Sequence, residues 1–499
     1  MILHEISAMF WAMRLQRQPV SQRRVGTCDP LSRAMLLADQ KRCIVRGMTP
    51  DHRVRNFLAL LFVLLICASP GWAEPKTKLA LVGGMLLDGY DVPPVHHATI
   101  LIEGNRIVKV GPSSEVAIPS DAKVIDTSGR VMMPGLIDVH VHLQILGHGD
   151  YLRWEPWIAQ NHLVEKVGEI SAKQLLNAGV TSAVDLGGTL KESLEVRDRI
   201  NRGEIPGPRM LVSGPWITRS LGEGFYSTAL DDQILVDTPE QAAAAVDKLA
   251  AAGVDVIKAY VNLTPAHYKA IVDAAHRHNL RVHAHVYDPD DVRNAFEAGV
   301  DVLQHVGSAG VPTYDPALVK AIAVKGTPVV VTAAHRAFLF PATVDFPERL
   351  QDPQLKIDFG PQIWEEVQNS LRNFQRLYYF STTDQEIRFS RASLGQWIDA
   401  NVTLGMGTDS GTPMNFHTES LWREMKAHVD LGMAPQRVIC AATRVNAQIL
   451  GKGAELGTIE PGKLADIIVV RGNPVFDITA VANVEVVIKD GRVYKGAGN

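Results

Sequence analysis

Histidines occur in closely spaced pairs near the ends of two apolar runs, and this spacing is typical of metal binding. The first run, residues 131–142, reads VMMPGLIDVHVH. Alternate side chains of a β-strand lie on one face, so Asp138, His140 and His142 share a face while apolar residues occupy the other. Two imidazoles held at the end of a buried strand are suitable metal ligands. Ordinary polar packing is the alternative, but the Pro-Gly-Leu-Ile-Asp run before the pair makes it the less favoured interpretation.

The second pair lies in residues 280–287, LRVHAHVY, where His283, His285 and Tyr287 share a face. Either histidine could be a ligand. Asp288 and the proline after it predict that a helix begins directly after this strand, which places His285 closer than His283 to the strand's C-terminal end. Tyr287 could hydrogen-bond a substrate carbonyl group or simply pack in the interior.

Three further side chains with useful chemistry lie in or at the end of strand-like runs. Lys258 lies in VDVIKAY, residues 254–260, and shares a face with the two valines. Burial disfavours an ammonium ion, so it would lower the pKa of this lysine and free the amine to react; a side chain that extends to solvent is the alternative. His305 ends the next run. Asp409 lies in GMGTDSG, residues 405–411, where an Asx turn or a helix cap is an everyday alternative.

Apolar strand-like runs alternate with amphipathic helical segments from Pro134 to about Gly451. This alternation predicts parallel strands joined by crossover helices. Roughly 320 residues with eight such units fit an α/β fold of the (β/α)8 type, the TIM barrel, in which chemistry takes place at the C-terminal ends of the strands. We expect the barrel domain to span 134–451, because Pro134 and Gly135 break the run 131–142. The first strand ends in His140 and His142, and the others are expected at 181–186, 209–213, 254–260, 280–287, 300–305, 327–332 and 402–409.

Both ends of the remaining chain are rich in short strand-like runs separated by turn residues. Residues 74–133 contain four such runs and residues 452–499 contain three, with Asp490 and Gly491 as a hairpin turn. Two strand-rich ends that flank a helix-rich middle predict one small β-sandwich domain. We expect its strands at 79–82, 99–103, 106–110, 123–126, 467–470, 484–489 and 492–494.

Residues 1–73 differ in composition from the rest of the chain, with 10 Lys and Arg against 4 Asp and Glu. Arg53 and Arg55 precede the apolar run 57–67, which is too short to span a bilayer and is typical of a secretory signal peptide cleaved before Glu74. We therefore expect an exported protein, periplasmic or secreted, with no membrane span in the mature chain. Such signals begin near their basic residues, so we expect Met48 to be the true start.

The remaining 426 residues carry 40 basic and 50 acidic side chains, and this acidic balance argues against nucleic acid as a partner. Cys440 is the single cysteine after residue 73, so the mature chain is expected to form no intramolecular disulfide. It lies in the apolar stretch VICAAT and is expected in the core.

With these motifs the chain resembles the metal-dependent amidohydrolase superfamily, in particular its prolidase and imidazolonepropionase-like branch. The family pattern His-Ala-Tyr, with Glu-His twenty residues later, is similar to His285-Val286-Tyr287 and Gln304-His305. The resemblance therefore implies that His285 is the ligand and that His283 is a deeper polar neighbour. It also implies that residues 457–474 form a return strand of the β domain, with Asp466 as a scaffold residue.

The resemblance further implies two divalent metal ions bridged by a carboxylated Lys258, with zinc favoured and manganese, cobalt or iron possible. A metal-bridging hydroxide would attack the substrate carbonyl, Tyr287 would help to polarise that carbonyl, and Asp409 would bind the more exposed metal and carry the proton to the leaving group. The implied ligand set is His140, His142, Lys258, His285, His305 and Asp409.

The expected activity is hydrolysis of an amide or peptide-like bond in a small molecule such as a dipeptide or N-acyl amino acid. The same centre could act on a lactone or an organophosphate ester, and a non-catalytic metal-binding protein is a further alternative. The chain departs from its relatives after Lys258, where it reads AYVN, and at residues 219–227, RSLGEGFYS. These loops set specificity, so the substrates of the relatives cannot be assigned to this chain.

The aromatic-rich segment 338–389 is long for a loop at the catalytic rim. It could form a lid over an apolar pocket, a packing appendage or a dimer surface, and a homo-oligomer is possible. His335 precedes this segment and His417 follows the last strand. We expect both near the site, as supports of the ligands or as substrate contacts.

Overall fold

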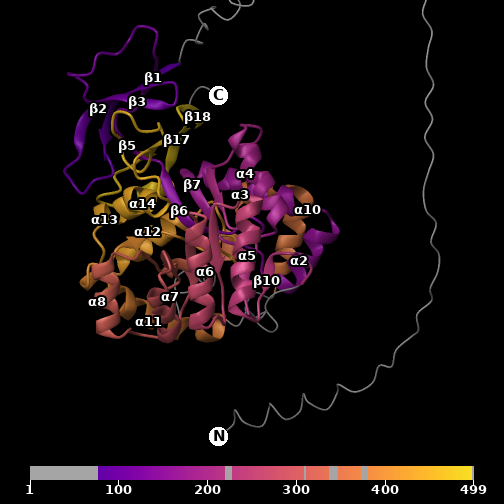
Figure 1. Cartoon of the computed structure of the whole chain (residues 1–499). Helices are drawn as coiled ribbons and strands as arrows, with labels where there is room; N and C mark the ends of the chain where they lie inside the picture. Colours follow the sequence, from indigo (N-terminus) through magenta and orange to yellow (C-terminus); the bar gives the residue numbers. More distant parts are fainter. Residues whose placement is uncertain (1–76, 220–227, 308–310, 336–346, 373–378, 497–499) are drawn as a thin grey trace, which may run out of the picture. The chain divides into compact units, whose positions relative to one another are not determined.

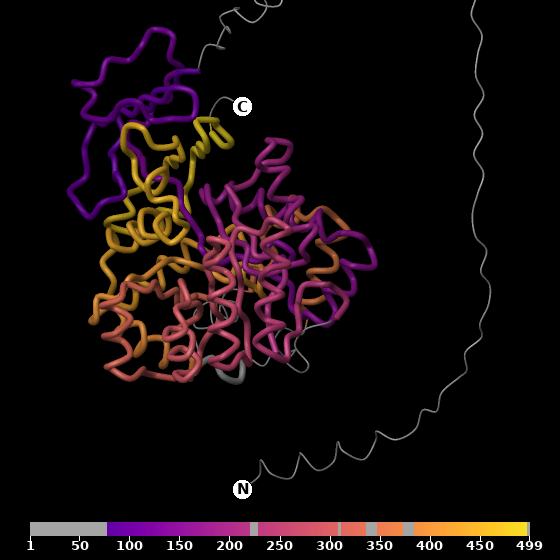
Figure 2. The backbone as a smooth tube through the Cα atoms, in the orientation of Figure 1, coloured from indigo at the N-terminus to yellow at the C-terminus, as the bar shows by residue number. Residues whose placement is uncertain are grey.

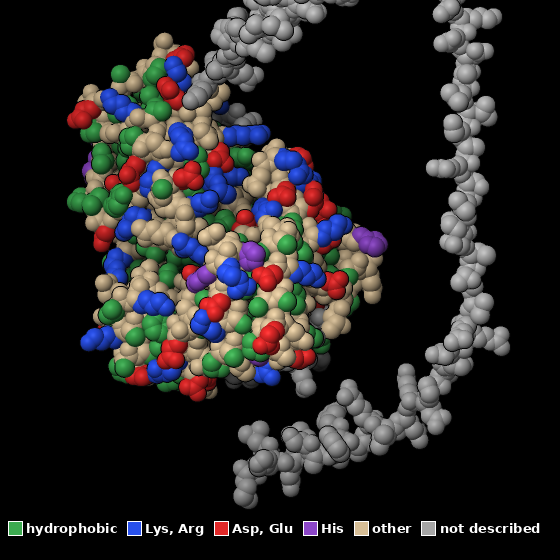
Figure 3. All heavy atoms as spheres, viewed as in Figure 1, with side chains coloured by type: hydrophobic (Ala, Val, Ile, Leu, Met, Phe, Trp, Pro, Cys, Tyr) green, Lys and Arg blue, Asp and Glu red, His purple; other side chains and the backbone are tan. Residues whose placement is uncertain are grey.

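The computed structural model describes residues 77–219, 228–307, 311–335, 347–372 and 379–496 (Figure 1). The expected signal peptide and the expected start at Met48 lie outside the described residues. Within these ranges, no helix combines the length and the hydropathy that a bilayer span would need. On the face shown in Figure 3, acidic and basic side chains are interspersed.

Eight parallel strands form the barrel, and all eight lie where the sequence predicts them, although most are shorter. Backbone hydrogen bonds close the sheet into a barrel. One runs from Val139 N in the first strand to Met406 O beside the eighth (3.1 Å), and another runs from Asp255 N before the fourth strand to Val212 O in the third (2.9 Å). The strands are β6 (Leu136–Val141), β7 (Val180–Asp185), β8 (Arg209–Val212), β11 (Val256–Ala259), β12 (Arg281–His285), β13 (Val302–Gln304), β14 (Val329–Val330) and β15 (Leu404–Gly405).

Helices follow the strands and cover the outside of the barrel (Figure 1). Side-chain caps fix the starts of several of them: Thr238 and Gln241 form a capping box at α5, and Asp288 accepts a hydrogen bond from Asp290 N at α7, where a helix start was predicted. The cap at α7 lies three residues after the end of β12. The helices are α3 (Val164–Asn177), α4 (Leu190–Asn201), α5 (Pro239–Ala252), α6 (Pro265–Arg277), α7 (Pro289–Ala298) and α8 (Pro316–Lys325).

Two short strands that the sequence analysis did not predict lie between β8 and β11. Strand β9 (Trp216–Thr218) pairs in parallel with β10 (Gln233–Leu235) and also contacts β11. Three residues are too few to show a strand period, which is why the pattern did not reveal them. They bring Trp216 and Asp232 to the mouth of the barrel, and this placement matters below.

Both ends of the described chain form one β domain, as predicted, and Figure 2 shows the indigo and yellow segments side by side. Strand order is β18-β17-β16-β5-β1-β2-β3, with β4 beside β1. The strands are β1 (Lys78–Leu86), β2 (Val95–Glu103), β3 (Arg106–Pro112), β4 (Lys123–Asp126), β5 (Arg130–Pro134), β16 (Ile467–Arg471), β17 (Val484–Lys489) and β18 (Arg492–Lys495).

The apolar run 131–142 forms two strands, and the boundary between them lies at Gly135, one residue after the expected start of the barrel domain at Pro134. The chain bends at Gly135, so β5 pairs with β16 in the β domain while β6 begins the barrel. A Cβ atom at Gly135 would lie 2.2 Å from the Thr181 hydroxyl oxygen, so only glycine fits this bend. Across the junction, Arg209 pairs with Asp466 at 2.7 Å, which agrees with the scaffold role expected for that aspartate.

The described part of segment 338–389 packs as a structural appendage. Helix α10 (Pro353–Leu371) buries Phe359 and Ile363 in a cluster with Trp154 and Phe416. Arg153 of α2 (Tyr151–Gln160) pairs with Glu366 of α10. Residues 336–346 and 373–378, where a lid was one expectation, lie outside the described residues. The remaining elements are α11 (Tyr379–Asp399), α12 (Ser420–Asp430), α13 (Pro435–Cys440) and α14 (Asn446–Ile449); Cys440 is buried, as expected.

Buried His148 should make the fold sensitive to acid. Its ring stacks on Trp154 with the centroids 5.0 Å apart, and burial lowers its pKa to about 3. Below about pH 6.5 the unfolded chain binds a proton at this histidine and the native chain does not, so the free energy of unfolding should fall by about 1.4 kcal/mol per pH unit from this residue. A His148→Gln variant lacks this slope. Urea unfolding at pH 7, 6 and 5 measures it, and parallel pH curves for the two proteins would contradict the assignment.

Candidate metal centre

The structure brings the six predicted ligand residues together at one end of the barrel. His140 and His142 lie at the end of β6, Lys258 in β11 and His285 at the end of β12. His305 directly follows β13, and Asp409 lies four residues after the end of β15. His142 Nε2 lies 3.0 Å and His140 Nε2 3.5 Å from Asp409 Oδ1. These three residues form a buried group of potential ligand atoms that all lie within 4.8 Å of one another.

The other three residues surround this group. Lys258 Nζ lies 3.4 Å from His140 Nε2. The ring of His305 lies 4.4 Å from that of His140 and 4.2 Å from that of His285, measured between centroids. Nitrogen and oxygen donors without a thiolate, held in a buried cluster, fit a divalent ion such as zinc.

Backbone conformation at the strand tips turns side chains toward this cluster. His305 and Asp409 both have positive φ values, 68° and 58°, which residues other than glycine seldom adopt. Gly407 lets β15 approach β6, because a Cβ atom there would lie 2.8 Å from His140 Cβ. Close approach of these two strands places Asp409 beside the paired histidines.

Gln304 connects the two histidine pairs, a role that the sequence analysis missed. Its Oε1 lies 2.9 Å from His140 Nδ1 and its Nε2 lies 2.9 Å from His283 Nδ1. Because the amide oxygen accepts from His140 Nδ1, the lone pair of His140 Nε2 faces the cluster. His283 therefore contacts a ligand residue through Gln304, in agreement with its expected position as a deeper polar neighbour.

Further hydrogen bonds fix the remaining ligand residues. His305 Nδ1 lies 2.9 Å from the Thr332 hydroxyl. Asp138 accepts hydrogen bonds from His140 N (3.1 Å) and from the Thr408 hydroxyl (2.7 Å), which ties β6 to the end of β15. Burial raises the pKa of Asp138 to about 8. Asp138 shares a strand face with His140, yet it supports the backbone of the ligand residues.

Asp409 is held from two sides. His142 contacts Oδ1, and His335 Nδ1 lies 3.2 Å from Oδ2, which places His335 beside the ligand as expected. Burial alone would raise the pKa of Asp409, but hydrogen bonds from these two histidines bring it well below its ordinary value. Asp409 is therefore an anion in this site.

His417 is buried and does not line the rim, which corrects one of the expectations for this residue. Its Nδ1 lies 2.8 Å from Ser410 Oγ and its Nε2 lies 3.1 Å from Ile145 O. Burial lowers its pKa to about 4. The neutral ring holds the loop that follows Asp409 against the loop that follows β6, so its contribution is to position the ligand.

Lys258 is buried beside His140, and Tyr287 lies beside His285 and His305. The Lys258 side chain is 1% exposed, and burial lowers its pKa to about 7, although Asp409 opposes the shift. A substantial neutral amine fraction at neutral pH follows. The half-buried ring of Tyr287 lies 4.6 Å from that of His285 and 5.4 Å from that of His305.

Glu424 is a buried carboxylate that positions the end of strand β14. Its oxygens accept hydrogen bonds from Ala333 N (3.0 Å) and Ala334 N (2.7 Å), and His428 Nε2 lies 2.9 Å from Oε1. These bonds fix the chain directly before His335. The sequence analysis did not identify Glu424, because a single helical glutamate carries no signal of a backbone contact so distant in the chain.

A Glu424→Gln substitution is expected to lower kcat by about 10- to 100-fold with little change in KM. The glutamine amide has one acceptor oxygen, whereas Ala333 N and Ala334 N each donate to a separate oxygen of Glu424. Steady-state kinetics of the metal-loaded enzyme measure this effect. Asp430→Asn, an exposed change on the same helix, is the control and should leave kcat unchanged. An unaltered kcat in Glu424→Gln would refute the positioning role.

Comparison with known proteins agrees with this geometry. The amidohydrolase family model matches residues 131–494. Ochratoxinase from Aspergillus niger is 26% identical over 470 residues, which cover 85% of this chain and 88% of the ochratoxinase. The structure of a prolidase candidate from Bifidobacterium longum is 28% identical with a TM-score of 0.65, covering 85% of this chain and 97% of its own. A Xaa-Pro dipeptidase structure with bound methionine is 25% identical with a TM-score of 0.66, covering 84% and 100%.

The chain therefore belongs to the amidohydrolase family. At this level the comparisons confirm the prediction of a metal-binding hydrolase that acts on carbon–nitrogen bonds. They also confirm the resemblance on which the ligand set was proposed, and the barrel fold with its composite β domain.

Proposed function

We propose that this protein is an exported amidohydrolase that uses two divalent metal ions to cleave an amide bond in a dipeptide or an N-acyl amino acid. The observation that carries the proposal is the convergence of six side chains from five barrel strands on one buried cluster. Relatives named as prolidase candidate, Xaa-Pro dipeptidase and ochratoxinase support a peptide-like substrate. The basic and apolar segment 53–67 supports export.

His140, His142 and Asp409 would hold one ion, and His285 and His305 the other. Carboxylated Lys258 would bridge them. Its neutral amine would attack the carbon of carbon dioxide, forming an N–C bond and releasing a proton, so that a carbamate anion with two donor oxygens results. Once bound, the ions would lower the pKa of water and polarise the substrate carbonyl group.

Asp409 and Tyr287 would handle the proton and the carbonyl oxygen. Asp409 is an anion beside the ligand histidines, so its carboxylate can accept a proton from the attacking water and donate it to the leaving amine. The phenol of Tyr287 lies next to His285 and His305 and can donate a hydrogen bond to the substrate carbonyl oxygen. His335 would hold Asp409 in position through both steps.

Metal removal tests this proposal. Purified protein should contain close to two divalent ions per chain by elemental analysis, and a chelator should abolish amide hydrolysis. Zinc, manganese or cobalt added back should restore it, while magnesium should not, because imidazole nitrogen suits the first three better. Measured in parallel against dipeptides, N-acyl amino acids, lactones and organophosphate esters, the enzyme should be most active on amides. Ester cleavage without amide cleavage, or metal-loaded protein without any activity, would contradict the proposal.

A further inference from the structure

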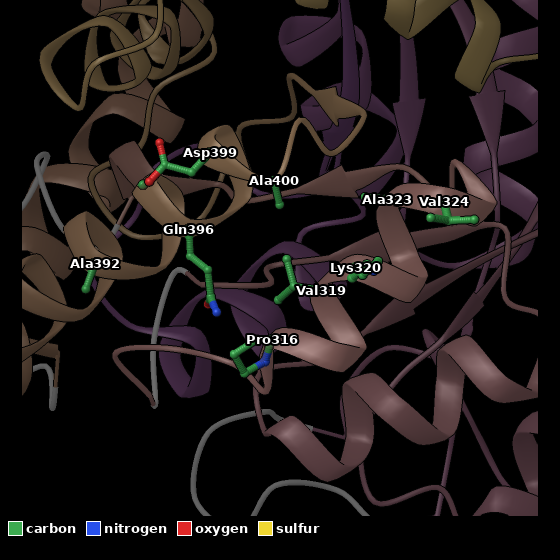
Figure 4. A pocket seen from close by; sticks show the side chains of 10 residues that line it. Pro316, Val319, Lys320, Ala323, Val324, Ala392, Gln396, Asp399 and Ala400 are labelled. Atoms are coloured by element: carbon green, nitrogen blue, oxygen red, sulfur yellow. The ribbon is translucent and has the colours of Figure 1, made fainter.

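A narrow cavity lies beside the metal centre, and His142 forms part of its wall. It is distinct from the larger outer groove between α8 and α11 shown in Figure 4, whose lining residues include none of the predicted ligands. The cavity beside His142 is lined by residues that follow β6 and β7, by helix α2 and by the β9–β10 insertion. Its position suggests a subsite for a group attached to the bond that is cleaved.

Most polar groups in this wall already have partners. Gln144 Nε2 donates a hydrogen bond to the Thr189 hydroxyl oxygen at 3.0 Å, and Gln144 Oε1 accepts one from Thr189 N at 2.9 Å. Trp216 Nε1 donates to Leu186 O at 2.7 Å. Asp232 differs: its side chain is buried, and its Oδ1 has no hydrogen-bond partner among the described residues.

Asp232 gives the cavity wall a buried acidic group, and no lysine or arginine is among the described lining residues. Burial raises the pKa of Asp232 to about 6, so the residue is still largely ionised at neutral pH. A buried carboxylate without a cationic partner is costly, and a bound cation would remove that cost.

An aromatic side completes the cavity. Trp216 stacks on Tyr260 with the ring centroids 4.6 Å apart and meets the His142 ring edge-on at 6.0 Å, which fixes the indole in the wall. The faces of aromatic rings attract cations. The space available to the centres of water-sized groups is about 30 Å³, enough for roughly two such groups, so the tip of a slender chain fits and a bulky ring does not.

We propose that this cavity binds a cationic group of the substrate, with Asp232 as the specificity-determining residue and a lysine side chain as the matching chemistry. The inference rests on the proposed function, since it names the substrate class for that same site. Recognition would consist of an ammonium ion that donates to Asp232 Oδ1 while its methylene groups lie along Trp216.

Matched substrates test this inference without any variant. Norleucine lacks only the ammonium group of lysine, so Ala-Lys is compared with Ala-norleucine and Lys-Ala with norleucine-Ala. We expect kcat/KM to be at least about tenfold higher for lysine in one of these pairs. The Asp232→Asn variant should lose this preference. Asp231→Asn, an exposed neighbour, is the control and should retain it. Equal rates within both pairs, or an unchanged preference in Asp232→Asn, would overturn the inference while amide hydrolysis itself stands.

Binding separates this inference from the proposed function. Titration calorimetry of the metal-loaded protein with free lysine and free norleucine requires no turnover. Lysine should bind at least about tenfold more tightly, and Asp232→Asn should remove the difference. If no amide is cleaved but this pattern appears, the proposed function fails and the cationic subsite stands. If lysine and norleucine bind alike, or neither binds, the subsite is refuted.

Discussion

An Asp409→Asn substitution is expected to lower kcat for amide hydrolysis by about 10³- to 10⁴-fold, because the asparagine amide can neither accept nor return the proton. Asn and Asp have nearly the same shape, so the contacts with His142 and His335 can persist. The loss should therefore appear in kcat more than in KM. Single-turnover and steady-state kinetics of the metal-loaded variant measure it.

Metal content separates proton transfer from metal loss in that variant. Elemental analysis should show that at least one ion per chain is retained, since four histidines and Lys258 remain. Asp399→Asn, an exposed change on α11, is the control and should have wild-type kinetics. Retention of even a tenth of wild-type kcat in Asp409→Asn would refute the role of this carboxylate.

A Lys258→Ala substitution is expected to remove the bridging anion, lower the metal content and reduce kcat/KM by about 10³-fold or more, because the activity of two-metal sites depends on both ions. A small carboxylate such as formate or acetate would fit the space of the proposed carbamate. Added at high concentration, it should restore part of the activity. Kinetics with and without the carboxylate measure the effect.

Carbon-13 NMR of wild-type protein grown or exchanged with labelled bicarbonate should show a carbamate signal that Lys258→Ala lacks. Lys489 provides a matched control, because it is also a buried lysine but donates to Gly207 O at 2.9 Å in the β domain. Lys489→Ala should lose stability and keep the carbamate signal. Absence of the signal in active wild-type protein would contradict carboxylation of Lys258.

Strand ends were the most predictable part of this site. Alternate residues of a strand share a face, which placed His140 and His142 together. The helix cap at Asp288 located the end of β12, so His285 was expected closer than His283 to the C-terminal end of that strand. The family pattern then completed the ligand set. Local sequence carries this information because strand period and helix capping depend on only a few neighbouring residues.

Residues whose roles depend on distant contacts were not predictable in the same way. Gln304 and Glu424 act on groups brought close by tertiary packing, and the strand that carries Trp216 is too short to show a period. In contrast, the break in the apolar run 131–142 was predictable, because Pro134 and Gly135 form a known local turn signal.

The bend at Gly135 also has a consequence for synthesis of the chain. The segment that carries the first two ligands is continuous with β5, and β5 finds its antiparallel neighbour only in β16, more than 300 residues later. Until Ile467–Arg471 has been made, β5 remains an open edge and the β domain is incomplete. Completion of the sheet that supports the strand carrying His140 is thus coupled to near-completion of translation.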